Sequence, residues 1–87
     1  MIDASSKVGT SLELYYYPSC PYCQKVLRFM RENTIGGIVL RNTRESSEDY
    51  DTLVRVGGKH QVPCLFIGGE PMYESDDIIA WLQRNVL

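Results

Sequence analysis

The residues best suited to chemistry in this chain are two cysteines separated by two positions, in the run Cys20-Pro21-Tyr22-Cys23. Two thiols at this spacing can close a disulfide with each other, and an ionised thiol can attack the sulfur of another disulfide. The spacing therefore predicts thiol–disulfide exchange. The third cysteine, Cys64, lies in the apolar run 64–67 and is expected to be a small buried core residue.

The elements around this motif are expected to give its two thiols different roles. Residues 12–17 are rich in aromatic side chains, which favours a strand, and apolar residues then follow Cys23 at helical spacing to about residue 33. Pro21 suits the first turn of that helix. Backbone N–H groups at the helix start favour a thiolate at Cys20, whereas Cys23 falls on the apolar stripe one turn further in. We therefore predict that Cys20 attacks and that Cys23 resolves the mixed disulfide.

The stretch after the motif predicts a strand and a second helix. Gly36-Gly37 ends the first helix, and the apolar run 38–40 is expected to be a buried strand. A strand–helix–strand unit of this length makes its two strands parallel, with a right-handed crossover. Ser46 then begins a capping box, with acidic residues in the first turn of a helix that Gly57-Gly58 ends.

The second half predicts an antiparallel hairpin and a final helix. Residues 64–67 and 72–73 are predicted strands on either side of a glycine turn, and Ser75 is expected to cap the last helix. Residues 1–11 are polar without periodicity and are predicted to form a flexible N-terminal tail. The predicted fold class of residues 12–87 is α/β, with a four-stranded mixed sheet and three helices. Their order is strand–helix–strand–helix–strand–strand–helix.

Composition limits the class of protein. The 87 residues suit one domain, and 44% hydrophobic with 23% charged residues is ordinary for a soluble globular protein. A net charge of −2 gives no reason to expect nucleic acid or an anionic membrane as partner. No apolar run approaches the roughly 20 residues of a transmembrane helix, and residues 1–6 lack a signal-peptide pattern. Three cysteines argue against a secreted disulfide framework, so we expect a cytoplasmic protein, and a monomer.

Three motifs give the chain a resemblance to the glutaredoxins, the small glutathione-dependent members of the thioredoxin-fold superfamily. They are Cys20-Pro21-Tyr22-Cys23 after the first strand, Val62-Pro63 before the third, and Ser75-Asp76 at the start of the last helix. The resemblance covers residues 12–87. It implies a thioredoxin-like fold and a glutathione-dependent thiol–disulfide oxidoreductase. Such an enzyme reduces protein–glutathione mixed disulfides and protein disulfides, with glutathione as co-substrate and no metal.

The resemblance also implies where glutathione binds. In the family, the proline matching Pro63 has a cis peptide bond beside the thiols, and the residue matching Val62 pairs its backbone with the cysteinyl part of glutathione. The pair matching Ser75-Asp76 holds the γ-glutamyl end. An unpaired backbone edge suits a peptide ligand, and a carboxylate at a helix start suits an amino-acid end. The predicted glutathione-binding residues are Tyr17, Tyr22, Gln61, Val62, Pro63, Ser75 and Asp76, with Tyr22 on the exposed rim.

Three features depart from the glutaredoxin pattern. One is Gln61, at the position where a threonine often precedes Val-Pro. Many glutaredoxins have a lysine three residues before the first cysteine, where it supports the thiolate and the glycine carboxylate of glutathione; here that position is Tyr17. Lys59 and Arg55 are candidates to replace the charge. A Gly-Gly pair commonly precedes the γ-glutamyl site, whereas this chain has Tyr73-Glu74. The run into Ser75 is more similar to the N-terminal domain of glutathione S-transferases, where Glu-Ser contacts the γ-glutamyl group.

The same residues leave alternatives open. A zinc site, with normally four ligands, would have to use Cys64 and His60 beside the two motif cysteines, and redox chemistry is favoured over it. Some glutaredoxins bridge two protomers with a [2Fe-2S] cluster, which the rigid Pro21 disfavours here. His60 is expected to have no catalytic role, since thiol exchange needs no separate base once Cys20 is ionised. The alternative functions are a redoxin reduced by thioredoxin reductase and a non-catalytic glutathione-binding or interaction module.

Overall fold

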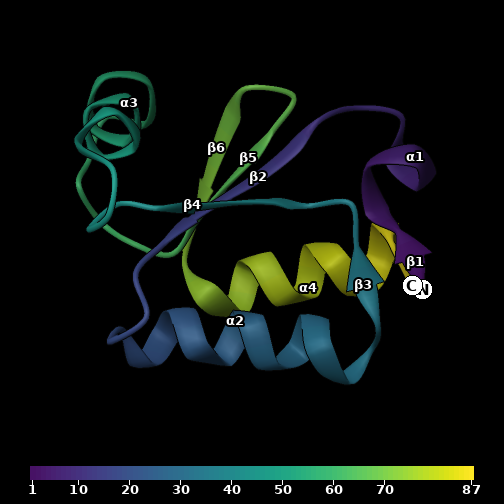
Figure 1. Ribbon diagram of the computed structural model, residues 1–87. Coiled ribbons are helices and arrows are strands. Elements are labelled where there is room, and N and C mark those ends of the chain that lie inside the picture. Colours follow the sequence, from purple (N-terminus) through teal and green to yellow (C-terminus); the bar gives the residue numbers. More distant parts are fainter.

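The computed structural model describes all 87 residues. The fold is organised around one central strand. This strand, β2 (Leu12–Tyr16), lies inside a four-stranded sheet of order β4-β2-β5-β6 (Figure 1). It pairs in parallel with β4 (Val39–Asn42) and antiparallel with β5 (Cys64–Ile67). The outer strand β6 (Glu70–Tyr73) pairs antiparallel with β5. The predicted α/β class and the four-stranded mixed sheet are confirmed.

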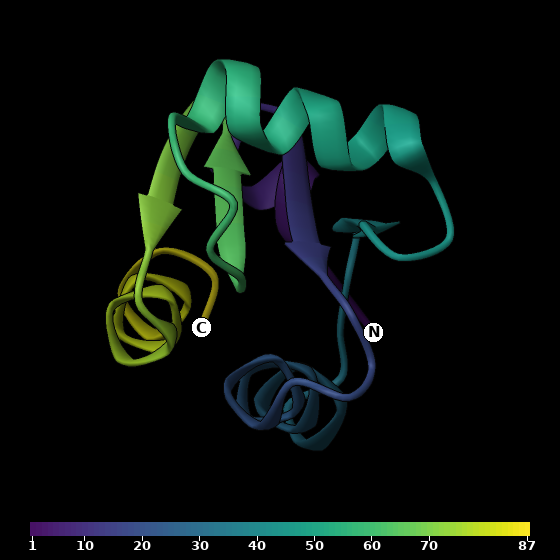
Figure 2. The same ribbon diagram turned by 90° about the vertical axis from the view of Figure 1, so that its left-hand side faces the viewer.

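Helices cover both faces of this sheet. The helices α2 (Pro21–Glu32) and α4 (Ser75–Asn85) pack together on one face, and α3 (Ser47–Gly57) lies on the other (Figure 2). Because side chains alternate along a strand, β2 sends Leu14 into a larger core and Tyr15 into a smaller one. The larger core includes Leu12, Leu14, Val26, Leu65, Ile78 and Leu82, and the smaller consists of Tyr15, Leu53, Cys64 and Phe66.

The ends of α3 follow local signals in the sequence. Ser46 caps the helix: its Oγ accepts a hydrogen bond from the backbone N–H of Asp49 at 3.1 Å. Gly58 ends it with a φ of 89°, a left-handed conformation that glycine adopts without strain. Both predicted boundaries of this helix are confirmed.

Neither α3 nor any other helix combines the length and apolar character needed to cross a bilayer.

Part of the segment predicted to be a flexible tail, residues 1–11, forms regular structure. The strand β1 (Ile2–Asp3) pairs in parallel with β3 (Ile35–Gly36), and α1 (Ala4–Val8) follows it. Ala4 is fully buried in the larger core. A helix of five residues is too short to show hydrophobic periodicity, so the pattern did not reveal it. The structure therefore has four helices where the sequence predicts three.

Two predicted details of the other elements are wrong. The sequence predicts a buried strand at 38–40, but Val39 and Leu40 are 50% and 46% exposed, because β4 is an edge strand without a neighbour on its outer side. Ser75 is predicted to cap α4, but it is the first helical residue. The N-cap is Glu74, whose φ of 74° turns the chain into the helix without a side-chain capping hydrogen bond.

Candidate active site

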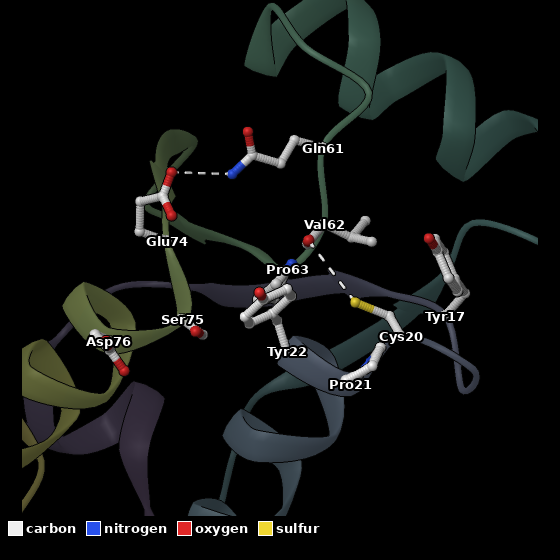
Figure 3. Close-up of a pocket in the computed structure, with 10 residues that line it drawn as sticks. All are labelled: Tyr17, Cys20, Pro21, Tyr22, Gln61, Val62, Pro63, Glu74, Ser75 and Asp76. Carbon is white, nitrogen blue, oxygen red and sulfur yellow. Dashed lines mark hydrogen bonds between the residues drawn. The ribbon is translucent and has the colours of Figure 1, made fainter.

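One cleft, with a volume of about 570 Å³, lies where the N-termini of α2 and α4 approach the segment before β5. Figure 3 shows Cys20 and all seven residues predicted to bind glutathione around this cleft. Pro21 and Glu74 complete its lining of ten residues. Cys23 does not line it. The seven predicted residues are Tyr17, Tyr22, Gln61, Val62, Pro63, Ser75 and Asp76, and Tyr22 is exposed, as expected for a rim residue.

Cys20 occupies the N-cap position of α2. Its Sγ accepts a hydrogen bond from the backbone N–H of Cys23, 3.4 Å away, and its thiol donates to the carbonyl oxygen of Val62 at 3.9 Å (Figure 3). The residue is only 6% exposed, yet it borders the cleft. An N–H group that points at the sulfur stabilises negative charge there, so this position suits a thiolate nucleophile.

Cys23 lies one turn further along α2 in a different environment. It is fully buried, which confirms the shielding predicted from the apolar stripe. Burial, with a smaller contribution from the neighbouring Cys20 sulfur, raises the pKa of the Cys23 thiol to about 12. Cys23 is therefore a neutral thiol at pH 7. The geometry separates a sulfur that a ligand can reach from one that it cannot.

Three residues before β5 form the wall of the cleft between the two helix starts. The Val62–Pro63 peptide bond is cis, as the resemblance implies. Gln61 Nε2 donates to Glu74 Oε1 at 3.2 Å, which ties this wall to the residue before α4. Glu74 is a lining residue that the predicted set omits. Glu74 could have been predicted from the sequence, because Glu74-Ser75 matches the Glu-Ser pair that contacts the γ-glutamyl group in glutathione S-transferases.

The start of α4 forms one end of the cleft. Ser75 is 8% exposed, whereas the exposed Asp76 forms an ion pair with Lys25 of α2. Because α4 has no side-chain cap, backbone N–H groups of its first turn are available to an anion. Sequence reasoning missed Lys25 because its partner lies 51 positions away, and only the packing of α2 against α4 brings the two together.

Beside the other end of the cleft, behind the lining residue Tyr17, lies a cation that sequence reasoning also missed. Arg44, in the loop between β4 and α3, places its guanidinium carbon 3.7 Å from the centre of the Tyr17 ring. Its Nη1 donates to Ser19 Oγ at 2.9 Å, beside the first cysteine. None of Arg44, Lys59 and Arg55 is itself a lining residue. Arg44 contacts the lining residue Tyr17, whereas the Lys59 ammonium lies over the ring of Tyr73, which does not line the cleft. The structure therefore assigns the positive charge at this end to Arg44.

The remaining chemically capable residues lie away from the cleft. Cys64 is fully buried in the smaller core, as predicted, and burial raises the pKa of its thiol to about 11. His60 is exposed on the segment before the wall. No three side chains among His, Cys, Asp and Glu come close enough together to hold a metal ion. The residues considered for a zinc site therefore do not converge.

Comparison with known proteins identifies the family. Residues 14–86 match the sequence model of the family described as glutathione S-transferase, N-terminal domain. The chain belongs to this family. The chain is also similar in sequence to glutaredoxin-1 of Oryctolagus cuniculus, which is 25% identical over 79 residues, covering 85% of this chain and 74% of that protein. The resemblance predicted from the motifs is confirmed, and it supports a glutathione-related family of thiol oxidoreductases.

Solved structures of both kinds of protein have the same fold as this member of the family. The holo form of glutaredoxin C1 from Populus tremula x tremuloides gives a TM-score of 0.65 at 21% identity, covering 95% of this chain and 84% of that chain. A glutathione transferase of Bombyx mori gives a TM-score of 0.71 at 22% identity, covering 88% of this chain and 36% of that chain. At these identities the likeness shows the thioredoxin-like fold alone.

Proposed function

We propose that this chain is a glutathione-dependent thiol–disulfide oxidoreductase with Cys20 as its nucleophile. The observation that carries the proposal is the position of Cys20 Sγ, which lies between the Cys23 N–H and the Val62 carbonyl in a cleft that ends at the start of α4. The cleft thus presents a reactive sulfur, a backbone edge and a charged helix start to one extended ligand. Glutathione has the matching groups in the same order: a sulfur, a peptide backbone and an α-amino-acid end.

The charges at the two ends of the cleft set the proposed binding mode. The ligand sulfur meets Cys20 Sγ, and the cysteinyl peptide pairs with the backbone at Val62, as a peptide adds to a sheet edge. The ammonium of the γ-glutamyl group faces Asp76, and its carboxylate faces the first N–H groups of α4. At the opposite end, the glycine carboxylate faces Arg44 beside Tyr17. An extended zwitterion with a second carboxylate fits this arrangement of charges.

The proposed reaction consists of two disulfide exchanges. The Cys20 thiolate attacks the glutathione sulfur of a protein–glutathione mixed disulfide; that S–S bond breaks, and the protein thiolate leaves and takes up a proton. A second glutathione, as its thiolate, then attacks the Cys20–glutathione disulfide. This step releases the Cys20 thiolate and forms oxidised glutathione. Two electrons thus pass from glutathione to the substrate, and no other oxidant or reductant is needed.

Cys23 enters the proposed cycle only with protein disulfides. Attack by Cys20 then leaves a mixed disulfide with the substrate, and Cys23 attacks the Cys20 sulfur, releasing the second substrate thiol. The resulting Cys20–Cys23 disulfide is reduced by glutathione. Because the pKa of Cys23 is raised to about 12, we expect this resolving step to be slower than the first attack.

The proposed partners are glutathione and glutathionylated or disulfide-containing proteins. We propose that the chain acts as a monomer, since one chain supplies both ends of the cleft and both thiols. An odd number of cysteines, all free, is more usual in a reducing compartment, which supports a cytoplasmic location. The proposed cycle itself depends on the availability of reduced glutathione.

Turnover of one substrate with two reductants tests this function. The substrate is a mixed disulfide between glutathione and a small thiol. We expect reduced glutathione to sustain turnover, and thioredoxin reductase with NADPH not to sustain it. Turnover with the reductase alone would identify a redoxin with a different electron donor. Binding of glutathione without turnover by either reductant would identify a non-catalytic binding module.

A further inference from the structure

The α4 end of the cleft has two carboxylates, and none of the ten lining residues is a cation. Glu74 accepts a hydrogen bond from Gln61, and Asp76 pairs with Lys25, which reaches it from α2. A γ-glutamyl group brings both an ammonium and a carboxylate to this end. Protein carboxylates attract the ammonium but repel the ligand carboxylate. A positive side chain at this end would therefore add to the attraction that the helix start has for the ligand carboxylate.

Lys25 provides such a charge, and its ion pair with Asp76 leaves hydrogen-bonding groups free on both side chains. Its Nζ contacts only Oδ1 of Asp76, so Oδ2 stays available for another donor. An ammonium group has three N–H donors, and a carboxylate accepts several hydrogen bonds. The two side chains are 52% and 80% exposed, so a ligand can reach both without the burial of an unpaired charge.

We propose that Lys25 determines specificity by binding the α-carboxylate of the γ-glutamyl group while it remains paired with Asp76. This inference rests on the proposed function, because it deepens the description of the same site. The ligand ammonium takes the free Oδ2 of Asp76. Because the ammonium and the carboxylate of an amino acid are attached to one carbon, the ligand carboxylate then lies near Lys25. The four charges alternate in sign, so each one attracts both of its neighbours.

The alternative role for Lys25 is competition, in which Lys25 and the ligand ammonium compete for the carboxylate of Asp76. Competition predicts tighter binding when Lys25 is removed, whereas the alternating arrangement predicts weaker binding. The contact of Lys25 with a single oxygen of Asp76 favours the alternating arrangement, since the second oxygen needs no displacement. The two roles therefore differ in the sign of the effect that a substitution has on KM.

Steady-state kinetics of Lys25→Met test the proposal with two substrates. One is the mixed disulfide of glutathione with a small thiol, and the other is its analogue with the γ-glutamyl α-carboxylate converted to an amide. With the first, we expect KM to rise roughly three- to tenfold at nearly constant kcat, because the lost contact binds ground state and transition state alike. With the amide, KM should change little. Lys25→Arg keeps the charge and should retain most of the affinity for the first substrate.

Lys7→Met is the matched control for this substitution. It removes the same charge from an exposed position on α1, at the far end of the molecule from the start of α2 (Figure 1). An unchanged or lowered KM in Lys25→Met, or an equal rise with both substrates, would overturn the role of Lys25 while leaving the proposed function intact. Absence of turnover in the unmodified chain would instead overturn the proposed function. Calorimetry would then still test the role of Lys25. The affinity for glutathione should be lower in Lys25→Met than in the unmodified chain, by the same three- to tenfold factor.

Discussion

The cleft lies between two helix N-termini that begin in different ways. The first, α2, begins at Cys20, whose sulfur accepts the N–H of Cys23, whereas α4 begins at Glu74, whose side chain makes no capping hydrogen bond. At α2 a backbone N–H group of the first turn donates to Cys20 Sγ, the sulfur proposed to be the nucleophile. At α4 the first-turn N–H groups and the Oδ2 atom of Asp76 are left for a ligand. The same local feature thus serves reactivity at one end and recognition at the other.

This division predicts two classes of substitution. Changes at Cys20, the N-cap of α2, should affect every disulfide substrate, because each reaction passes through its sulfur. Changes at the start of α4, or at the opposite rim around Arg44, should affect only substrates that have the corresponding ligand group. The two ends can therefore be separated by comparing substrates as well as variants.

The largest effect is expected for Cys20→Ser. A serine hydroxyl is not ionised at neutral pH and is not a sulfur nucleophile, so all thiol-exchange activity should fall to the uncatalysed level. Serine is also a good N-cap residue, so the helix start should persist, which far-UV circular dichroism can verify. Turnover of a glutathione mixed disulfide and of a protein disulfide are the two measurements. Activity clearly above background would show that another cysteine can attack.

A large difference is also expected between the two cysteines of α2 in their reaction with an alkylating reagent. Because the pKa of Cys23 is raised to about 12, its alkylation rate should rise about tenfold for each pH unit from pH 7 to pH 11. At pH 7 the product should be a single adduct on Cys20, identified by mass spectrometry after short incubation. Cys64, buried with a pKa raised to about 11, should also react slowly. Modification of Cys23 before Cys20 at pH 7 would reverse the assigned roles.

An intermediate and selective effect is expected for Asp76→Ala. Loss of a charge-assisted hydrogen bond to the ligand ammonium should lower kcat/KM for a glutathione mixed disulfide roughly tenfold. A small disulfide without a γ-glutamyl group should be attacked at an unchanged rate. Asp77→Ala is the matched control, since Asp77 is the other exposed acid of the same helical turn and does not line the cleft. Equal losses on both substrates would mean that Asp76 supports the helix and does not bind the ligand.

The smallest effect is expected for Arg44→Ala. Arg44 is exposed, so removing its contact with the glycine carboxylate should raise KM for a glutathione mixed disulfide only about threefold. The corresponding γ-glutamylcysteine disulfide lacks the glycine and should show no change. Arg55→Ala, an exposed arginine on α3 that does not line the cleft, serves as the control. The same increase in KM for both substrates would argue against a glycine carboxylate at this rim.

Most of the fold was predictable because its signals are local. The apolar stripe of α2, the Ser46 cap and the final glycines of α3 each depend on residues within one element. Two predictions, a tail at residues 1–11 and a buried strand at 38–40, failed because the local hydrophobic pattern gave no usable signal. The helix α1 is too short for periodicity, and the exposure of Val39 depends on β4 having a neighbour on one side only.

The site was predictable only as far as its motifs extend. Cys20 and the seven other predicted residues do surround one cleft, because the motifs mark where strands end and helices begin. Lys25 and Arg44 were missed because each acts through a contact with a distant residue, Asp76 and Tyr17 respectively. A sequence shows that a charged side chain is present, but the partner of that charge depends on how helices and loops pack.

A pair of assays on Cys23→Ser shows whether Cys20 alone is sufficient for reaction with glutathione substrates. If Cys20 alone reacts with glutathione substrates, this protein should turn over a glutathione mixed disulfide at least as fast as the unmodified chain, since the adduct can no longer be diverted into an internal disulfide. Its reduction of a protein disulfide should be lost, because an intramolecular thiol has a far higher effective concentration than free glutathione. Loss of both activities in a folded Cys23→Ser protein would contradict the account, because it would show that the two thiols act only together.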